Sequence, residues 1–136
     1  MKKLDNFINC LTILANADFK MAETNDIYRT GVIGQFNLTF ELAWKALQEI
    51  MRKHGVEDSS TGSPREILQL GYKFGFIDDS ETWLLMLKKR NTSDHIYNEE
   101  EVDELILLIR DSFIPAFTAL KDTLARKLDE AESNWG

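Results

Sequence analysis

Apolar and polar side chains alternate along this chain with the period of an α-helix. Near the start, Leu4, Phe7, Leu11 and Leu14 are separated by steps of three, four and three residues. Such steps place the four side chains on one face, because an α-helix has about 3.6 residues per turn. The pattern predicts a first helix that ends in the polar stretch around residues 23–25.

A second apolar pattern predicts a long helix. Apolar side chains recur at helical steps from Val32 to Met51, and Gly55 follows, where glycine can adopt the left-handed conformation that ends many helices. The helix should therefore be about two dozen residues long. Residues 56–62 are rich in Asp, Ser, Thr and Gly, so they are predicted to form a loop.

A capping signal predicts the next, shorter helix. Ser63 stands three residues before Glu66, with Pro64 at the position of the first helical residue. In a capping box the serine oxygen accepts from the backbone N–H of the glutamate, whose carboxylate reaches back to the N–H of the serine. We expect a short helix from here to about Phe74.

Two more helices complete the pattern. Residues 78–80 supply a cap for a helix that ends near Arg90, and the last helix begins after Asn98. Its apolar positions keep the helical period as far as Leu128. Pro115 lies inside this helix and should bend it, because proline lacks a backbone N–H and crowds the preceding turn.

These patterns predict an all-α protein. The sequence has no strand-like alternation, and long helices with short connections favour an up-and-down four-helix bundle with an additional short helix. We expect one domain over residues 1–130 and a frayed tail over 131–136. Five large side chains on the long helices either fill the core of one chain or, in excess of what that core needs, form a dimer interface: Phe36, Phe40, Trp44, Phe113 and Phe117.

Composition narrows the functional classes. The formal net charge of −7 argues against broad nucleic-acid binding, so any contact with RNA must be local. Cys10 is the only cysteine, which excludes an internal disulfide and a cysteine-based zinc site. No apolar run could span a bilayer, and the first residues do not resemble a signal peptide, so a cytoplasmic protein with no membrane association is expected.

The candidate catalytic residues lie at and after the end of the predicted helix that finishes near Arg90. Arg90 is followed after four residues by His95 and then by Tyr97. Arginine offers a planar fork of donors to a phosphate, and histidine titrates nearest to neutral pH. Residues five apart on one helix face different directions, so Arg90 and His95 converge only if the helix ends between them. Residues 91–94 are weak helix formers, which makes an end there plausible.

Arg-x4-His-x-Tyr after an apolar helix resembles the signature of the HEPN proteins, and more closely their branch of nucleotidyltransferase substrate-binding proteins. That branch pairs with a minimal nucleotidyltransferase. Four segments of this chain are similar to it in order and spacing, which makes the resemblance specific and extends it over most of the chain: Phe40–Lys45, Ser63–Glu66, Gly75–Ile77 and Trp83–Tyr97.

The resemblance implies a dimeric, metal-independent ribonuclease toxin with a separately encoded nucleotidyltransferase partner. It implies that His95 is the acid and base, that Arg90 clamps the phosphate, and that Asn91 and Asp94 orient them. In the toxin–antitoxin pairs of the family, the partner transfers AMP to the motif tyrosine, which here is Tyr97. The added phosphate would occupy the Arg90 clamp and block the substrate.

Three other residues are candidates for the substrate cleft. Glu41 and Lys45 are four residues apart on the second long helix and would form an ordinary exposed ion pair, whereas the resemblance suggests that they line the cleft. Arg65 follows the helix-opening proline and either reaches a phosphate or stays solvated. The sequence has no Gly-rich phosphate loop, carboxylate triad or Cys/His metal spacing, so we expect no metal ion or cofactor.

Two other functions compete with the ribonuclease. One is a noncatalytic subunit that binds a nucleotide or another substrate and presents it to the nucleotidyltransferase, which the acidic net charge favours. The other is a scaffold with a decayed site, in which Arg90 forms an ion pair with Asp94 and the remaining motif residues are structural. Cleavage of RNA that depends on His95 would discriminate between these hypotheses.

Overall fold

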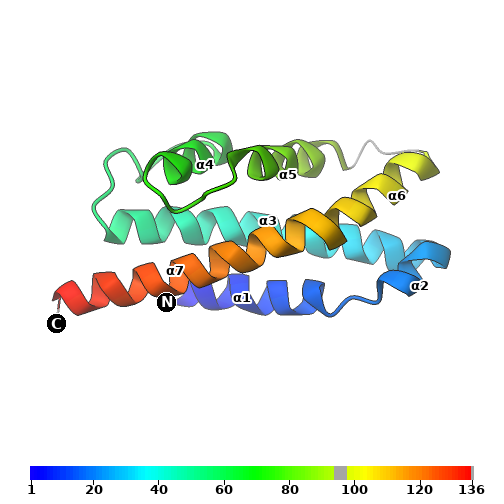
Figure 1. The fold of residues 1–136 in the computed structure, drawn as a ribbon, viewed down its shortest axis with the longest axis horizontal. Coiled ribbons are helices and arrows are strands. Elements are labelled where there is room, and N and C mark those ends of the chain that lie inside the picture. Colours follow the sequence, from blue (N-terminus) through cyan, green and yellow to red (C-terminus); the bar gives the residue numbers. More distant parts are fainter. Residues whose placement is uncertain (94–97, 136) are drawn as a thin grey trace.

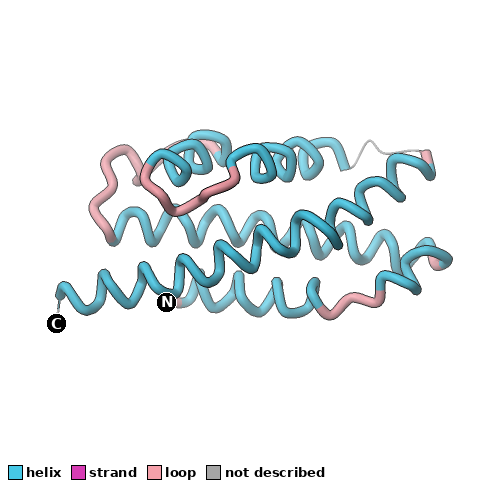
Figure 2. The backbone as a smooth tube through the Cα atoms, in the orientation of Figure 1, coloured by secondary structure: helices cyan, strands magenta, loops and turns pink. Residues whose placement is uncertain are grey.

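Figure 1 shows the computed structural model, which describes residues 1–93 and 98–135. Every regular element in these two ranges is helical, as the sequence predicts, and helices account for most of the tube in Figure 2. The elements are α1 (Lys2–Ala15), α2 (Phe19–Thr24), α3 (Asp26–Lys53), α4 (Pro64–Lys73), α5 (Ser80–Thr92), α6 (Glu99–Leu108), the π-helical turn η2 (Ile109–Phe113) and α7 (Ile114–Trp135).

The helices form the predicted up-and-down bundle. In Figure 1, α1 and α3 run antiparallel, α4 and α5 together run back along α3, and the continuous rod of α6, η2 and α7 returns across the bundle. α1 packs mainly against α3, and α7 packs against both. The third of the four helical segments of the bundle is thus made by two consecutive helices, α4 and α5. Of these, α4 is the predicted short helix.

The first predicted helix is divided in two, so the prediction of one helix as far as residues 23–25 is wrong. α1 ends at Ala15, and Asp18 caps the separate helix α2. The carboxylate of Asp18 accepts hydrogen bonds from the backbone N–H groups of Lys20 and Met21, at 3.1 and 3.0 Å. An aspartate that caps a new helix favours a break in the preceding one.

The other predicted helix starts are confirmed by their caps. The Ser63 hydroxyl accepts from the N–H of Glu66 at 3.2 Å, and the Glu66 carboxylate accepts from the N–H of Ser63 at 3.3 Å, which completes the capping box. Asp79 caps α5 and Asn98 caps α6. These contacts satisfy backbone donors that have no partner inside the helix.

The disturbance expected near Pro115 takes the form of a widened turn. The π-helical residues 109–113 come immediately before the start of α7, and Pro115 is its second residue. Proline cannot donate to the carbonyl of Asp111 four residues earlier, and its ring would crowd that carbonyl. A π turn changes the local hydrogen-bond pattern, which provides room for the proline without ending the helix.

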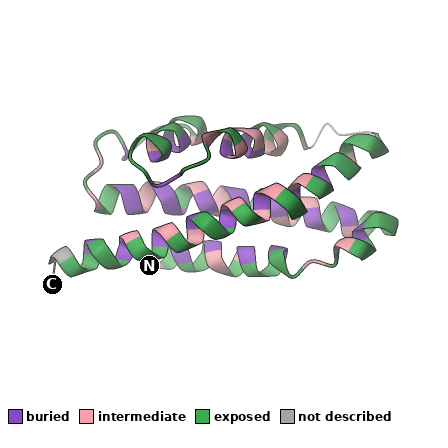
Figure 3. Cartoon of the chain, viewed as in Figure 1, coloured by how far each residue is buried: buried purple, intermediate pink, exposed green. Residues whose placement is uncertain are grey.

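The large aromatic side chains fill the core of the single chain. Phe36, Phe40, Phe113 and Phe117 are fully buried, and the rings of Phe36 and Phe113 stack with centroids 5.2 Å apart. Trp44 is partly buried and packs against the same core. The interpretation of the four phenylalanines as a surplus that forms a dimer interface is therefore wrong, whereas for Trp44 it stays a prediction. Figure 3 shows buried positions along the inward faces of the helices.

A buried arginine of α3 forms ion pairs with the start of α6. Only 9% of the Arg29 side chain is exposed, and its guanidinium donates to Asp103 at 2.6 Å, to Asp26 at 2.9 Å and to Glu99 at 3.4 Å. Burial alone would lower the pKa of Arg29, but the hydrogen bonds to Glu99 and Asp26 and the charge of Asp103 raise it above its ordinary value. The guanidinium of Arg29 is therefore used in contacts that stabilise the packing of α3 and α6.

The last helix continues into the segment for which fraying is predicted. α7 extends to Trp135, and Ala131 is buried. Fraying of residues 131–136 in solution, and the assignment of 1–130 as one domain, stay predictions. Across the residues that the structure describes, none of the helices has the length and apolar character needed to cross a membrane.

Candidate functional site

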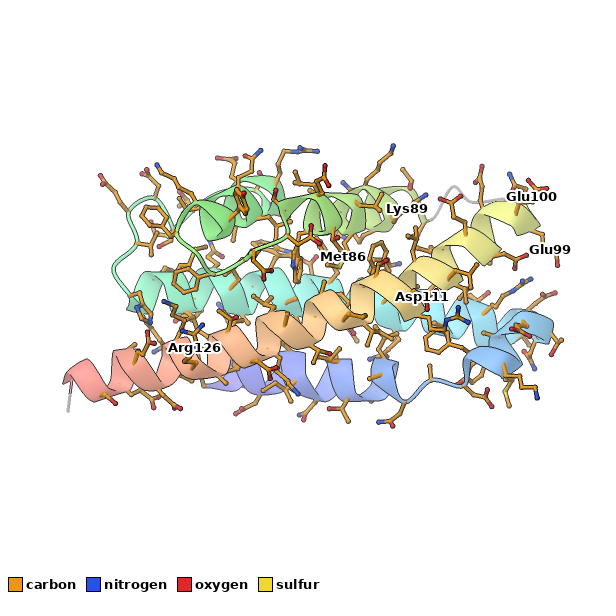
Figure 4. All side chains as sticks on the ribbon, in the orientation of Figure 1. Met86, Lys89, Glu99, Glu100, Asp111 and Arg126 are labelled. Atoms are coloured by element: carbon orange, nitrogen blue, oxygen red, sulfur yellow. The ribbon has the colours of Figure 1, made fainter. Side chains whose placement is uncertain are left out.

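The core-facing side of α5 carries Arg90 to the edge of the bundle. Trp83, Met86 and Leu87 are buried on this helix, and Arg90 follows at the helical steps that keep it on the same side. Figure 4 labels Met86 and, one turn later, Lys89, which lies 3.4 Å from Glu104 of α6. Because α5 ends at Thr92, Arg90 belongs to its last turn.

Glu41 of α3 receives the Arg90 guanidinium. Arg90 Nη2 donates to Glu41 Oε2 at 2.7 Å, and Arg90 Nη1 donates to the Asn91 side-chain oxygen at 3.2 Å. Lys45 Nζ lies 3.3 Å from the other carboxylate oxygen of Glu41. One carboxylate is thus shared by two cations, and the three groups together carry one net positive charge. About a third of the Arg90 side chain, 35%, is exposed.

A polar contact attaches the end of α5 to α3 beside this pair. The Asn37 amide donates to the Ser93 hydroxyl at 3.0 Å, and that hydroxyl donates to the Arg90 carbonyl at 3.0 Å. The Asn37 oxygen and the Trp44 indole nitrogen are buried and have no hydrogen-bond partner among the described residues. Both residues belong to α3, the helix that carries Glu41.

The structure brings together some of the predicted site residues. Arg90, Asn91, Glu41 and Lys45 form one cluster, in which Glu41 makes both the exposed pair with Lys45 and the contact with Arg90. Arg65 lies in the first turn of α4 and makes no ion pair with the described part of this cluster. Three predicted residues lie outside the described residues: Asp94, His95 and Tyr97.

Sequence reasoning did not identify Asn37 and Ser93 as part of the cluster. The available signal was the spacing of Asn37, which stands four residues before Glu41 and therefore on the same side of the helix. Ser93 lies inside the motif but was considered only as a weak helix former. No group of three or more His, Cys, Asp or Glu side chains in residues 1–93 and 98–135 is placed to hold a metal ion.

Comparison with known families agrees with the motif. A model of the family described as nucleotidyltransferase substrate binding protein-like matches residues 2–126. The chain belongs to this family. The resemblance predicted from the four sequence segments is therefore confirmed. Among similar proteins, the probable ribonuclease HepT of Haemophilus influenzae is 23% identical over 111 residues, which cover 80% of this chain and 76% of HepT.

Two solved structures have the same fold as this family member. HI0074 of Haemophilus influenzae, described as a substrate-binding domain of a nucleotidyltransferase, superposes with a TM-score of 0.76 at 21% identity over 90% of this chain and 98% of HI0074. A mutant of the MntA–HepT toxin–antitoxin pair contains a chain with a TM-score of 0.71 at 16% identity, over 92% of this chain and 96% of the other. These similarities show a shared helical bundle.

Proposed function

We propose that this protein is the HEPN-type partner of a minimal nucleotidyltransferase in a toxin–antitoxin pair, and that it cleaves RNA without a metal ion. Membership of the substrate-binding family and the similarity to probable ribonuclease HepT support this proposal. The observation that carries it is the geometry of Arg90. A partly exposed guanidinium with one strong partner stands at the end of a helix, five residues before His95.

The chemistry assigns one role to each motif residue. His95 removes the proton from a ribose 2′-OH, and the 2′ oxygen attacks the adjacent phosphorus. The bond from phosphorus to the 5′ oxygen breaks, and the leaving oxygen takes a proton from the imidazolium of His95. The products are a 2′,3′-cyclic phosphate and a 5′-OH end. Arg90 stabilises the negative charge that gathers on the phosphate oxygens as the new bond forms.

The contact with Glu41 fits this role for Arg90. A phosphate oxygen can replace the carboxylate because the guanidinium is partly solvated, and a planar fork binds two oxygens at once. Lys45 shares Glu41 and supplies a second positive charge within the same cluster. Asn91 donates nothing to Arg90 but accepts from it at 3.2 Å, which helps to hold the guanidinium in place.

The proposal includes regulation by the partner enzyme. Transfer of AMP to the Tyr97 hydroxyl would add a phosphate two residues after His95, where Arg90 could bind it in place of RNA. Incubation with the cognate nucleotidyltransferase and ATP, followed by mass spectrometry, should find AMP on Tyr97. AMP on other residues alone would contradict the assignment. We also propose a cytoplasmic homodimer, in which two motifs act together.

A noncatalytic subunit that presents a nucleotide to the nucleotidyltransferase is the second candidate. The net charge of −7 and the carboxylate of Glu41 beside Arg90 both disfavour a long polyanion such as RNA. A single nucleotide makes fewer phosphate contacts and tolerates this environment better. Tight nucleotide binding without cleavage of RNA would favour this function.

One experiment separates the two candidates. Purified wild-type and His95→Ala proteins are incubated with total cellular RNA in the presence of EDTA, and the products are analysed for 2′,3′-cyclic phosphate ends. We expect cutting by the wild type alone. If neither protein cuts RNA, the result would contradict the ribonuclease and favour the noncatalytic subunit that presents a nucleotide.

A further inference from the structure

Helix α3 holds Arg90 at two points, one helical turn apart. The guanidinium of Arg90 donates to Glu41 at 2.7 Å, and its backbone carbonyl accepts from the Ser93 hydroxyl at 3.0 Å. That hydroxyl in turn accepts from the Asn37 amide at 3.0 Å. Asn37 and Glu41 are four residues apart, so they lie on the same side of α3. The side chain of Arg90 directly, and its backbone through Ser93, are therefore attached to one helix, along which α5 runs (Figure 1).

The direction of the hydrogen bonds from Asn37 to Arg90 follows from their last acceptor. A backbone carbonyl can only accept, so the Ser93 hydroxyl donates its single proton to Arg90. The hydroxyl oxygen must then accept from Asn37, which turns the amide nitrogen of Asn37 toward Ser93. Both contacts are part-buried, and water competes less strongly for donors and acceptors there.

The end of α5 lacks the glycine that follows α3 and α4. Gly55 comes after α3 with a φ of 71°, and Gly75 comes after α4 with a φ of 79°. A glycine in this left-handed conformation closes a helix by hydrogen bonds between residues close in the chain. Ser93, the residue after α5, keeps the right-handed values of φ −62° and ψ −29°, and Asp94 follows it in the sequence. The last turn of α5 is thus held by a contact with another helix.

Asn37 is an unfavourable residue for packing alone. Its side-chain oxygen is buried and has no hydrogen-bond partner among the described residues. A buried acceptor that has lost its water lowers stability, and an apolar side chain of similar size, such as leucine, avoids that loss. Proteins keep such costly polar groups mainly at functional sites. The contact with Ser93 is therefore the best reason for an asparagine at this position.

We propose that Asn37 is a positioning residue, which holds the last turn of α5 against α3 and so directs the Arg90 guanidinium toward the substrate phosphate. The inference rests on the ribonuclease proposed above and concerns how its site is ordered. Asn37 does not touch the substrate, because its amide nitrogen is engaged and its oxygen is buried. It acts through Ser93 on the backbone of Arg90, whereas Glu41 acts on the guanidinium.

The Asn37 contact should affect the rate of cleavage more than the binding of RNA. Helix ends open more readily than helix centres, so without Asn37 the last turn of α5 frays and the Arg90 guanidinium samples more orientations. A phosphate in the ground state tolerates a slightly displaced guanidinium. The charge that develops in the transition state is stabilised well only by a donor that is already in place.

Single-turnover cleavage of RNA in EDTA tests this role. Asn37→Leu and Ser93→Ala each interrupt the link to Arg90, and we expect each to lower the rate about tenfold. The affinity for a noncleavable 2′-O-methyl RNA should change by less than about twofold, and the Tm of Asn37→Leu should be no lower than that of wild type. Ser93→Thr, which keeps the hydroxyl, should cut at nearly the wild-type rate. Wild-type rates in Asn37→Leu and Ser93→Ala would overturn the proposal.

Two further variants separate positioning from a general loss of packing. Gln35→Leu removes a comparable part-buried contact of α3, from the Gln35 amide to the Cys10 carbonyl at 3.1 Å, and should leave the rate unchanged. Asn37→Leu combined with Arg90→Ala should cut no more slowly than Arg90→Ala alone, because Asn37 acts through Arg90. A further loss of about tenfold in the combined variant would contradict the proposal.

Amide hydrogen exchange keeps this inference separate from the ribonuclease. The N–H groups of residues 89–92 should exchange at least about fivefold faster in Asn37→Leu and Ser93→Ala, while those of residues 84–87 exchange as in wild type. Unchanged exchange at 89–92 would overturn the inference even if the wild type cuts RNA. A wild type that cuts no RNA, with faster exchange in both variants, would contradict the ribonuclease and support the attachment of Arg90 by Asn37.

Discussion

Arg29 and Arg90 are two arginines with opposite surroundings. Arg29 is 9% exposed and donates to three carboxylates, from Asp26, Glu99 and Asp103. Arg90 is 35% exposed and has one carboxylate partner, Glu41, which it shares with Lys45. The guanidinium of Arg29 is held by three carboxylates of the fold, whereas that of Arg90 is proposed to exchange its single carboxylate partner for a phosphate.

The difference separates an arginine that stabilises the packing of helices from an arginine for which we propose a role in binding a phosphate. The partners of Arg29 come from α3 and α6, and they stabilise the packing of these helices. Arg90 extends from the last turn of α5 and is balanced by a single charge. We therefore expect substitutions at Arg29 to change stability and substitutions around Arg90 to change ligand binding.

Replacement of Arg29 should have the largest effect on stability. Arg29→Ala removes the ion pairs that link α3 to Glu99 and Asp103 of α6, so we expect the free energy of unfolding to fall by about 2 kcal/mol. The three carboxylates are solvent-exposed and remain hydrated, which keeps the loss below that of a fully buried ion pair. Thermal unfolding should show a decrease in Tm of roughly 6–10 °C.

Arg110 provides the matched control. It pairs with the adjacent residue Asp111 on the same helical rod, and both side chains are well exposed. Arg110→Ala should change the free energy of unfolding by less than about 0.5 kcal/mol. Equal losses for the two substitutions would show that the Arg29 network is an ordinary surface pair.

A smaller effect is expected at the cap of the helix that carries Arg90. Hydrogen bonds from the Thr82 hydroxyl and backbone N–H lower the pKa of Asp79. The carboxylate therefore stabilises the fold above the usual aspartate pKa, and this contribution is lost as the pH falls through the lowered native pKa. Asp79→Ala should cost about 1 kcal/mol at neutral pH.

Urea unfolding of wild type and Asp79→Ala across the acid range checks this sign. The gap in unfolding free energy should be constant near neutrality and narrow below about pH 4. Asp79→Asn, which keeps a capping oxygen but does not titrate, should stay close to wild type at neutral pH. A gap that is independent of pH would contradict the role of the ionised carboxylate.

The smallest expected effect tests the competition at Arg90. Glu41→Gln keeps a hydrogen-bond acceptor for the guanidinium but removes the negative charge that opposes a phosphate. We expect a noncleavable 2′-O-methyl RNA to bind about threefold tighter, with the gain reduced at high salt. Fluorescence anisotropy measures this binding.

Glu49→Gln is the control on the same helix, because Glu49 pairs with Lys3 and Arg52 away from the cluster. It should leave the affinity nearly unchanged. Weaker binding by Glu41→Gln than by wild type would mean that the Glu41 charge positions Arg90 rather than competing with the phosphate.

Local signals in the sequence predicted the helices well. Apolar periodicity and the capping box of Ser63 gave the position of α4, because these effects depend on residues close together in the chain. The break after Ala15 was missed although Asp18 is a good capping residue, because the apolar pattern was followed through it. The π turn before Pro115 was expected only as a bend, since the sequence does not specify how a helix adapts to proline.

The cluster of side chains around Arg90 was predicted only in part, because some of its contacts depend on residues far apart in the chain. The motif identified Arg90, and the four-residue spacing identified the Glu41–Lys45 pair. That Glu41 also meets Arg90, 49 residues away, depends on how α3 and α5 pack. The same holds for Arg29, whose pair with Asp26 is local while Glu99 and Asp103 lie 70 and 74 residues away in the chain.

The rate of RNA cleavage by Arg90→Ala tests the central claim most directly. Single-turnover reactions in EDTA compare it with wild type at a temperature where both are folded. We predict a rate at least about 100-fold lower with an unchanged Tm, because a group that stabilises charge in the transition state is lost while the fold is kept. Cleavage at the wild-type rate by Arg90→Ala would contradict the assignment of Arg90 as the phosphate clamp.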